Sequence, residues 1–398
     1  MNGLIMDYPL TTNTILNYAK SAFPDKKIIT YLPNGSRHEY TYDQLYKRSC
    51  QLANALKNKL GITKGDMVGT FAWNHYQHVE LYYGIPGIGA VCHTINIRLS
   101  SQQTEFIINH SEDKIIFVDA TLVPLLEKIA SKLETVEKYI IINAPENFST
   151  TLINTIHYED LLKGQLDSIR WPELNENEAC GMCYTSGTTG MPKGVLYSHR
   201  STYLHAMTIM TPNAGNYSNE DVILLIVPQF HVMAWGFPYM CLLTGADMVM
   251  PSLHLQPKAI IRILESEDIN KANGVPSIWR GVYDEMKKNP PKKKLALKEY
   301  LVGGSALSVS LIENFEKDFD IKGVQAWGMT ETSPLGTASR LQSKHKKLSK
   351  KDQLKVRAKQ GIEFQGIEMR IVGDDGKVAP RDGKTMGELQ VKGAWVIN

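Results

Sequence analysis

Eleven residues in the middle of the chain combine the side-chain types that hold phosphate groups. The stretch 184–194 reads YTSGTTGMPKG and lies between two apolar runs that predict strands, ACGMCY and VLYSH. Glycines let backbone N–H groups approach an anion closely, hydroxyl groups donate further hydrogen bonds, and a lysine adds positive charge. The stretch supplies these groups as Thr185, Ser186, Gly187, Thr188, Thr189, Gly190, Lys193 and Gly194. We therefore predict a polyphosphate-binding loop between two strands.

Two other interpretations fit this loop less well. It is not a Walker P-loop, because the GxxxxGK[ST] spacing is absent and Pro192 precedes the lysine. A flexible linker rich in Gly, Ser and Thr is not expected to carry Met-Pro-Lys within an alternation of strands and helices.

Strand-like and helix-like runs alternate on both sides of the loop. KIIFVD (114–119) and EYLVGG (299–304) predict buried strands, and 42–61 predicts an amphipathic helix. Such alternation is typical of mainly parallel sheets covered by helices. Because 398 residues exceed the ~250–300 that one core usually fills, we expect an α/β fold with two such sheet subdomains. The expected division is 1–180, 181–340, and a basic segment with the start of a small, partial β-barrel subdomain over 341–398.

Composition excludes several classes of protein. With 43% hydrophobic and 21% charged residues, the chain is neither disordered nor collagenous, and a net charge of +3 does not indicate nucleic acid as a partner. The apolar span 222–243 is interrupted by Pro228, His231 and Pro238, so it predicts a strand, a loop and a core helix rather than a membrane span. Few cysteines and no apparent signal peptide predict a cytoplasmic location. The cysteines, expected as core residues, are Cys50, Cys92, Cys180, Cys183 and Cys241.

The loop resembles the signature loop of the adenylate-forming (AMP-binding) superfamily, which includes acyl-CoA synthetases, luciferases and peptide-synthetase adenylation domains. Four further stretches resemble motifs of this family in the family's order. They are PQFHVMAW (228–235), GVPSIW (274–279), VGGSA (302–306) and QAWGMTETSP (325–334). Within the superfamily, the chain resembles the large N-terminal domain of a medium- or long-chain fatty acyl-CoA synthetase.

This resemblance implies a site for ATP. The implied ATP-binding residues are Thr185, Ser186, Gly187, Thr188, Thr189, Gly190, Lys193, Gly304, Ser305, Gln325, Ala326, Trp327, Gly328, Met329 and Thr330. Trp327 is expected to stack on adenine, Thr330 to contact the α-phosphate, and Glu331 to hold Mg²⁺ with help from Thr185. The residues expected to carry the chemistry are Lys193, Thr330, Glu331 and His231.

The resemblance also implies an acyl site and a two-step reaction. The implied acyl-binding residues are His231, Val232, Trp235, Val275, Gly303 and Gly304. A carboxylate would attack the α-phosphate of ATP to give acyl-AMP, and the thiol of CoA would then displace AMP. The partners are thus a fatty acid or related carboxylate, ATP and CoA, and related synthetases are often homodimers.

Family members continue beyond the matched motifs into a Thr-Gly-Asp segment and a mobile C-terminal domain. This chain shows neither, so we expect a truncated form with partial or reduced activity. One alternative is a nucleotide- or fatty-acid-binding domain that is inactive without that C-terminal domain. Another is a different adenylate-forming enzyme, but an amino-acid-activating domain would need an aspartate near position 231, and nothing supports a luciferase.

A basic segment follows the last motif. Residues 340–359 hold nine Lys or Arg and one Asp, a local net charge of +8. Such a run is usually a solvated face. A second basic cluster comprises Lys287, Lys288 and Lys292–Lys294. We hypothesise that one of the two attracts CoA phosphates or an anionic membrane surface, at most as a peripheral contact. His75 and His78 are expected at the surface or at a helix start.

Overall fold

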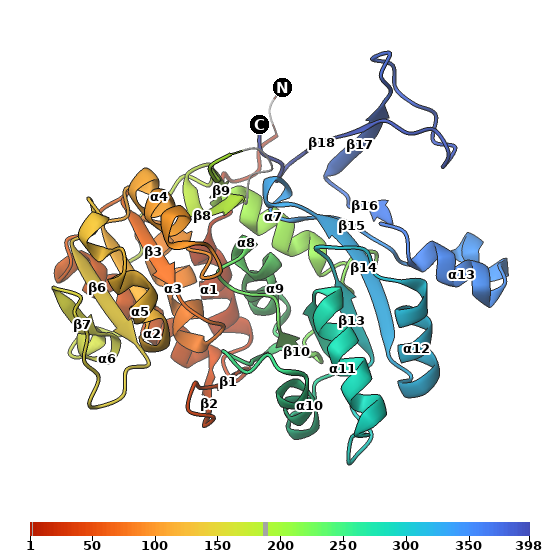
Figure 1. Cartoon of the computed structure of the whole chain (residues 1–398). Helices are drawn as coiled ribbons and strands as arrows, with labels where there is room; N and C mark the ends of the chain where they lie inside the picture. The colour runs from red at the N-terminus through yellow and green to blue at the C-terminus, as the bar shows by residue number, and fades with distance from the viewer. Residues whose placement is uncertain (2, 186–189) are drawn as a thin grey trace.

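The computed structural model describes residues 1, 3–185 and 190–398. Figure 1 shows two sheet-and-helix halves side by side, with both ends of the chain near one another at the top. A thin extension carrying the last strands projects from the second half. The α/β fold with two mainly parallel sheets is as predicted.

The first sheet has seven strands in the order β7-β6-β5-β3-β4-β8-β9, all parallel except β9. Its central strands are continuous apolar runs because helices cover both faces. The strands are β3 (Met67–Phe71), β4 (Val91–Thr94), β5 (Ile115–Asp119), β6 (Lys138–Ile142), β7 (Thr155–His157), β8 (Ala179–Thr185) and β9 (Lys193–Ser198).

The second sheet has nine strands in the order β16-β15-β14-β13-β12-β10-β11-β1-β2. The run from β14 to β1 is parallel. β2 pairs antiparallel with β1, β15 with β14, and β16 with β15. The strands are β1 (Lys27–Tyr31), β2 (Arg37–Thr41), β10 (Val222–Leu225), β11 (Asp247–Met250), β12 (Lys271–Gly274), β13 (Glu299–Val302), β14 (Lys322–Gly328), β15 (Leu335–Ala338) and β16 (Ile362–Glu363). A separate antiparallel pair follows, β17 (Ile367–Val372) and β18 (Glu388–Gly393).

Sheet membership does not follow the expected division of the sequence. β1 and β2, from the expected first subdomain, pair with β11 of the second sheet. β8 and β9, which span the expected boundary at residue 180, complete the first sheet. Within 341–398, β16 extends the second sheet, so only β17 and β18 stand apart from it. The two halves therefore exchange strands.

A layer of helices lies between the sheets and forms the main core. α3 and α9 are buried along their whole length, and α1, α2 and α7 pack around them. α10, α11 and α12 cover the other face of the second sheet. The helices are α1 (Thr12–Ala22), α2 (Tyr42–Asn58), α3 (Tyr76–Gly87), α4 (Ser101–Ser111), α5 (Val123–Glu127), α6 (Tyr158–Leu162), α7 (His199–Ile209), α8 (Val232–Trp235), α9 (Phe237–Thr244), α10 (Pro257–Ser266), α11 (Pro276–Lys288), α12 (Val309–Phe319) and α13 (Lys350–Arg357). Short 3₁₀ turns are η1 (Ala120–Leu122), η2 (Ala130–Lys132), η3 (Thr330–Thr332) and η4 (Ser343–Lys347).

Three local predictions, for the helix from Tyr42, the span 222–243 and the cysteines, are confirmed. α2 forms as predicted, with Leu45, Leu52 and Leu56 buried and a capping box between Thr41 and Gln44. The span 222–243 divides into β10, a loop, α8 and α9, and no helix of the described residues is long and apolar enough to cross a membrane. All five cysteines are buried and unpaired.

The surface alternative for His75 and His78 is wrong, although the helix-start expectation holds. His75 is the N-cap of α3, and both rings are fully buried. The ring of His78 bonds Thr70 Oγ1 at 3.0 Å and the Trp73 carbonyl at 3.0 Å. Burial is tolerated because the ring nitrogens are paired.

Two buried histidines make stability depend on pH. Burial lowers the pKa of His78 and of His205 to about 3 each, far below the value of about 6.5 for an unfolded chain. Between these values the unfolded chain takes up protons that the folded chain refuses, so stability is lost as pH falls below about 6.5. We expect the unfolding temperature to be level from pH 7 to 8 and to decline from pH 6.5 to 5.

His205→Gln tests the cause of this decline. His205 Nε2 accepts a hydrogen bond from the Leu335 N–H at 3.2 Å, which the glutamine amide oxygen can replace without titrating. Toward pH 5, where the unfolded histidine is almost fully protonated, the variant should lose up to about 1.4 kcal/mol per pH unit less than the wild type. An equal pH dependence in both proteins, measured by urea unfolding, would contradict the assignment.

Candidate active site

The predicted phosphate-binding loop lies at the tip of the β8–β9 hairpin. Thr185 is paired with Lys193 across the two strands. Thr185 is half-buried, whereas Gly190 and Lys193 are exposed. Lys193 has no ion-pair partner among the described residues. The remaining predicted loop residues, Ser186, Gly187, Thr188 and Thr189, lie outside the described residues.

Aromatic hydroxyl groups hold the hairpin against its surroundings. The Tyr184 hydroxyl lies 2.7 Å from His110 Nδ1 on α4. The Tyr197 hydroxyl on β9 donates to the Thr330 carbonyl at 2.8 Å. Burial raises the pKa of both tyrosines, which keeps the phenols protonated at neutral pH. The second bond brings η3, with Thr330 and Glu331, against the hairpin.

The turn after β14 is fixed by its own hydrogen bonds and by the end of the chain. The Met329 N–H donates to the Pro334 carbonyl at 3.1 Å and to Thr332 Oγ1 at 3.0 Å. The Glu331 carbonyl accepts from the Ile397 N–H at 2.9 Å. The Glu331 side chain is half-buried and makes no ion pair within the described part of the chain. An unengaged carboxylate is held here on a rigid backbone.

The Trp327 side chain is half-buried at the end of β14. A Cβ on Gly336 of β15 would lie 2.9 Å from the Trp327 ring, so this glycine lets the strand pass close to the indole. A half-exposed indole on a rigid strand can stack on a planar ring.

The loop after β13 is held from below by Gln325. Its side chain is only 1% exposed, and its Oε1 accepts from the Leu307 N–H at 2.5 Å. Its Nε2 donates to the Ser305 carbonyl at 3.4 Å and to the Ala326 carbonyl at 2.7 Å. Gln325 therefore positions the Gly303–Ser305 backbone. Gly304 has φ +82°, a conformation that favours glycine.

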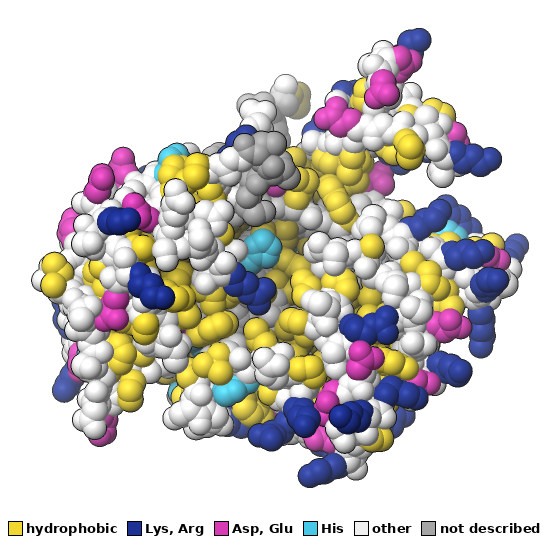
Figure 2. Space-filling view, in the orientation of Figure 1, with side chains coloured by type: hydrophobic (Ala, Val, Ile, Leu, Met, Phe, Trp, Pro, Cys, Tyr) yellow, Lys and Arg dark blue, Asp and Glu magenta, His cyan; other side chains and the backbone are white. Residues whose placement is uncertain are grey.

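Four of the predicted acyl-binding residues, Trp235, Gly303, Gly304 and Val275, lie in two close contacts that form an apolar wall. Trp235 is 5% exposed and packs so closely on Gly303 that a Cβ there would lie 2.9 Å from the indole Cη2 atom. A Cβ on Gly304 would contact Val275 Cγ1 at 3.5 Å. Figure 2 shows the surface hollowed between the two halves, with hydrophobic side chains lining the hollow.

The turn that carries this wall has an unusual backbone. In α8, φ lies between 48° and 55° at four successive residues, Val232, Met233, Ala234 and Trp235, and Gly236 follows at 73°. Left-handed backbone costs about 1–2 kcal/mol for each residue with a Cβ, so the surroundings must stabilise this turn.

His231 immediately precedes the left-handed turn. The residue as a whole is exposed, whereas Val232 is buried. The protein around the ring and the nearby Arg98 cation lower the pKa of His231, so the imidazole is neutral at pH 7. A neutral imidazole can donate a hydrogen bond to a substrate oxygen.

Comparison with known proteins decides the family. The model of the family described as AMP-binding enzyme matches residues 17–398. The chain belongs to the AMP-binding enzyme family. The superfamily prediction from the motifs is confirmed, and the chain is an AMP-forming acid–CoA ligase that uses a carboxylate, ATP and CoA.

Curated relatives match essentially the whole chain. A medium-chain-fatty-acid–CoA ligase of Ectopseudomonas oleovorans is 39% identical over 100% of this chain and 72% of its own length. A 3-methylmercaptopropionyl-CoA ligase of Ruegeria lacuscaerulensis is 39% identical over 100% of the chain and 74% of its own. A long-chain-fatty-acid–CoA ligase of Thermus thermophilus is 37% identical over 98% and 70%.

A solved structure supports the fold. The crystal structure of a long-chain-fatty-acid–CoA ligase from Archaeoglobus fulgidus superposes with a TM-score of 0.84 at 21% identity, covering 100% of this chain and 77% of that one. The layered arrangement of two parallel-rich sheets is therefore that of acyl-CoA ligases.

The residues available for Mg²⁺ in this AMP-binding enzyme are few. Within the described ranges no group of three or more His, Cys, Asp and Glu side chains could hold a metal ion. Mg²⁺ commonly needs only one or two carboxylates together with substrate phosphates. The unengaged Glu331 carboxylate and the half-buried Thr185 hydroxyl fit that pattern.

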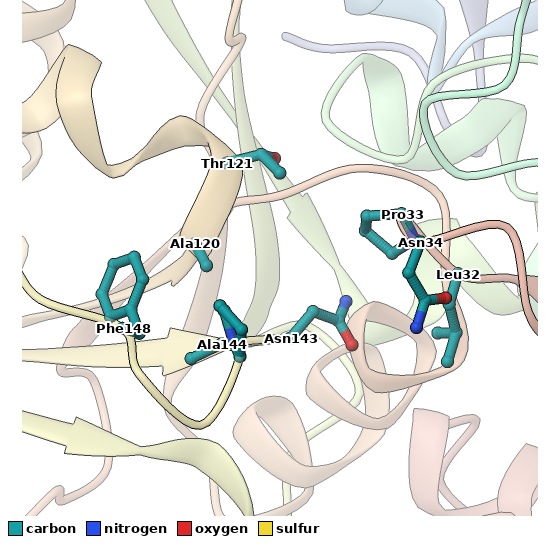
Figure 3. Close-up of a pocket in the computed structure, with 9 residues that line it drawn as sticks. Leu32, Pro33, Asn34, Ala120, Thr121, Asn143, Ala144 and Phe148 are labelled. Carbon is teal, nitrogen blue, oxygen red and sulfur yellow. The ribbon is translucent and has the colours of Figure 1, made fainter.

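A separate cavity lies away from all predicted site residues. It has a volume of about 510 Å³ and lies between the β1–β2 turn and the ends of β5 and β6 (Figure 3). It is lined by Leu32, Pro33, Asn34, Ala120, Thr121, Asn143, Ala144, Pro145 and Phe148. None of these residues belongs to the predicted nucleotide or acyl site.

Sequence reasoning missed three buried amides that contact the acyl segment, Asn74, Gln229 and Asn273. Each is at most 4% exposed. Asn74 comes two residues after the apolar run ending at Ala72, where polar side chains often gather at the carboxyl ends of parallel strands. This location just after a strand was the sequence signal that could have identified Asn74 as a site residue.

Gly303→Ala tests the acyl wall. The new methyl group would lie 2.9 Å from Trp235, so the indole must move. We expect the KM for a fatty acid to change by about 10-fold or more in ATP–pyrophosphate exchange, and the KM for ATP to change by less than about 2-fold. Gly281→Ala on α11, whose methyl meets only Pro257, is the control. Equal changes in both KM values would contradict the wall.

Proposed function

We propose that this chain activates a medium- or long-chain fatty acid. A carboxylate oxygen attacks the α-phosphorus of ATP and pyrophosphate leaves, giving acyl-AMP. The thiol of CoA then attacks the acyl carbon and AMP leaves, giving acyl-CoA. The observation that carries the proposal is the apolar wall of Trp235 against Gly303, next to the Gln325-held loop.

We assign the triphosphate to the hairpin. The Lys193 ammonium and the hydroxyl and N–H groups of the loop would neutralise and orient the leaving pyrophosphate. These groups are Thr185, Ser186, Gly187, Thr188, Thr189 and Gly190. Mg²⁺, when bound, adds charge stabilisation for the phosphates, and Glu331 with Thr185 would hold it.

We assign the adenine to the surface between Trp327 and the loop at Gly304 and Ser305. Trp327 would stack on the base, while Gln325 keeps the loop backbone in place. Ala326, Gly328 and Met329 would border the base, and Thr330 would contact the α-phosphate. No general base is required, because the attacking carboxylate is already ionised at neutral pH.

We assign the acyl group to the wall behind His231. The neutral His231 imidazole would donate to the carboxylate, and Val232, Trp235 and Val275 would cover the alkyl chain. An apolar wall favours an alkyl chain over a polar side chain. The three relatives act on medium-chain, long-chain and 3-methylmercaptopropionyl groups, so chain length is the property to measure. Partial activity of the chain alone stays a prediction.

Detection of acyl-AMP tests this function. The chain is incubated with Mg-ATP and C3 to C16 fatty acids plus 3-methylmercaptopropionate, and adducts are measured by mass spectrometry. We expect acyl-AMP with medium or long acids, and none from a Lys193→Ala, Glu331→Ala double variant. An adduct that persists in the double variant would contradict the site, and ATP binding without any adduct would favour a binding domain.

We further propose a peripheral membrane contact through the basic segment. Arg340, Lys355 and Arg357 pair with acidic residues. The lysines of η4 and the start of α13 have no such partners among the described residues, and they flank Leu341 and Leu348, which are 37% and 40% exposed. Figure 2 shows basic side chains gathered on this side of the molecule. Fatty acids partition into membranes, where an anionic surface attracts lysine.

Vesicle sedimentation tests the contact. The basic residues are changed in one variant to Glu at Lys344, Lys346, Lys347, Lys350 and Lys351. We expect wild-type binding to vesicles containing phosphatidylglycerol, weakened by salt and lost in the variant. Reversal of the Lys292, Lys293 and Lys294 cluster is the control. Binding that survives the reversal of the basic segment, or that is lost equally in the control, would contradict the assignment.

The formation of a homodimer stays a prediction.

A further inference from the structure

The chain segment from Leu225 to Gln229 crosses the interior between β10 and the left-handed turn. Beyond Leu225, the last residue of β10, its backbone N–H and C=O groups need partners other than the sheet. Side-chain amides supply most of them. Asn273 Oδ1 on β12 accepts from the N–H groups of Ile226 and Val227, at 3.0 and 2.9 Å.

Asn74 makes three hydrogen bonds to the same segment. Its Nδ2 donates to the carbonyls of Leu225 and Val227, at 2.9 and 2.7 Å. Its Oδ1 accepts from the Gln229 N–H at 2.7 Å. Asn74 follows β3 of the first sheet, whereas Leu225 ends β10 of the second. One side chain therefore joins the two sheets at the segment that leads to His231.

The backbone of Asn74 and its neighbour extend this link. The Asn74 carbonyl accepts from the Ser252 N–H at 2.9 Å, just after β11. The His75 N–H donates to Gln229 Oε1 at 2.9 Å. His75 Nε2 in turn lies 2.9 Å from Asp119 Oδ2 at the end of β5. The Asn74 contact is thus anchored to strands of both sheets.

The next residues of the segment are those of the acyl site. His231 follows Gln229 by two residues, and the left-handed turn from Val232 to Trp235 begins directly after it. A strained turn persists only where neighbouring contacts determine its position. The N-terminal end of the turn is fixed by the hydrogen bonds of Asn74, Gln229 and Asn273. Its C-terminal end is fixed by the packing of Trp235 on Gly303.

We propose that Asn74 is a positioning residue for the acyl site, which holds His231 and Trp235 in place by bonding the Leu225–Gln229 backbone across the two sheets. This proposal rests on the proposed acyl site at His231 and Trp235. In the proposed site, Asn74 contacts neither ATP nor the carboxylate. Its loss should therefore act on the carboxylate and leave ATP binding intact.

Two variants of Asn74 test the proposal. Asn74→Ala removes all three bonds, and Asn74→Asp keeps the acceptor for the Gln229 N–H but cannot donate to the two carbonyls. In ATP–pyrophosphate exchange we expect both to raise the KM for a fatty acid by about 10-fold or more, and to change the KM for ATP by less than about 2-fold, because small misplacements of a binding group are costly. Equal losses for both substrates, or a wild-type KM in Asn74→Asp, would overturn the proposal.

Asn109→Ala is the matched control. Asn109 also donates through Nδ2 to a carbonyl, that of Lys132, and accepts at Oδ1 from the Glu134 N–H, at 2.9 and 3.0 Å. It lies on α4, away from the acyl segment. We expect this variant to change neither KM by more than about 2-fold. A carboxylate-selective effect in Asn109→Ala would show that any lost amide bridge acts this way, and would overturn the specific role.

Hydrogen exchange gives a readout that does not depend on catalysis. In Asn74→Ala, peptides covering 228–238 should exchange faster, while those covering β12 and β13 keep their wild-type rates. Unchanged exchange over 228–238 would overturn the positioning role of Asn74, whether or not the chain forms acyl-AMP. Failure of the wild-type chain to form acyl-AMP would contradict only the proposed function. If Asn74→Ala does not fold, Gln229→Ala, which loses the bond from the His75 N–H, carries both measurements with the same expected pattern.

Discussion

The backbone that crosses from β10 to the left-handed turn must pair its N–H and C=O groups away from water. Asn74, from the first sheet, and Asn273, from the second, provide these partners. An unpaired buried backbone group costs about as much as a lost hydrogen bond, so the crossing fixes the two sheets to one another. β1 and β2, which precede the strands of the first sheet in the sequence, also join the second sheet beside β11. The site depends on this junction, because its residues come from both halves.

Each segment of the site is then held by a buried polar group behind it. Tyr197 holds Thr330, Gln325 holds the loop at Ser305, and Asn74 holds the segment before His231. The residues assigned to substrate, such as Lys193 and Glu331, have no ion-pair partners in the described structure. Buried side chains thus fix the backbone, while the side chains assigned to substrate keep their charges unpaired within the described structure. A preorganised binding site needs both.

Local patterns in the sequence predicted the fold class and the loop between two strands, whereas the shared site of Trp235 and Gly303 was implied by the family resemblance. These features follow from apolar periodicity or from residues close in a motif. The strand exchange was not predictable, because the choice of strand partner depends on distant residues. The left-handed turn contradicts the local preferences of Val232 and Trp235 and exists only through tertiary contacts. The burial of His75 was missed for a similar reason, since its partner Asp119 lies 44 residues away.

A crystal structure with a non-hydrolysable fatty acyl-adenylate, such as an acyl sulfamoyl-adenosine, would test the central claim directly. We predict that adenine stacks on Trp327 beside Gly304, that the sulfamoyl group lies near His231 and Thr330, and that the alkyl chain lies along Trp235 and Gly303. An analogue bound instead in the cavity beside Phe148, or with its alkyl chain away from Trp235, would contradict the assignment of the site.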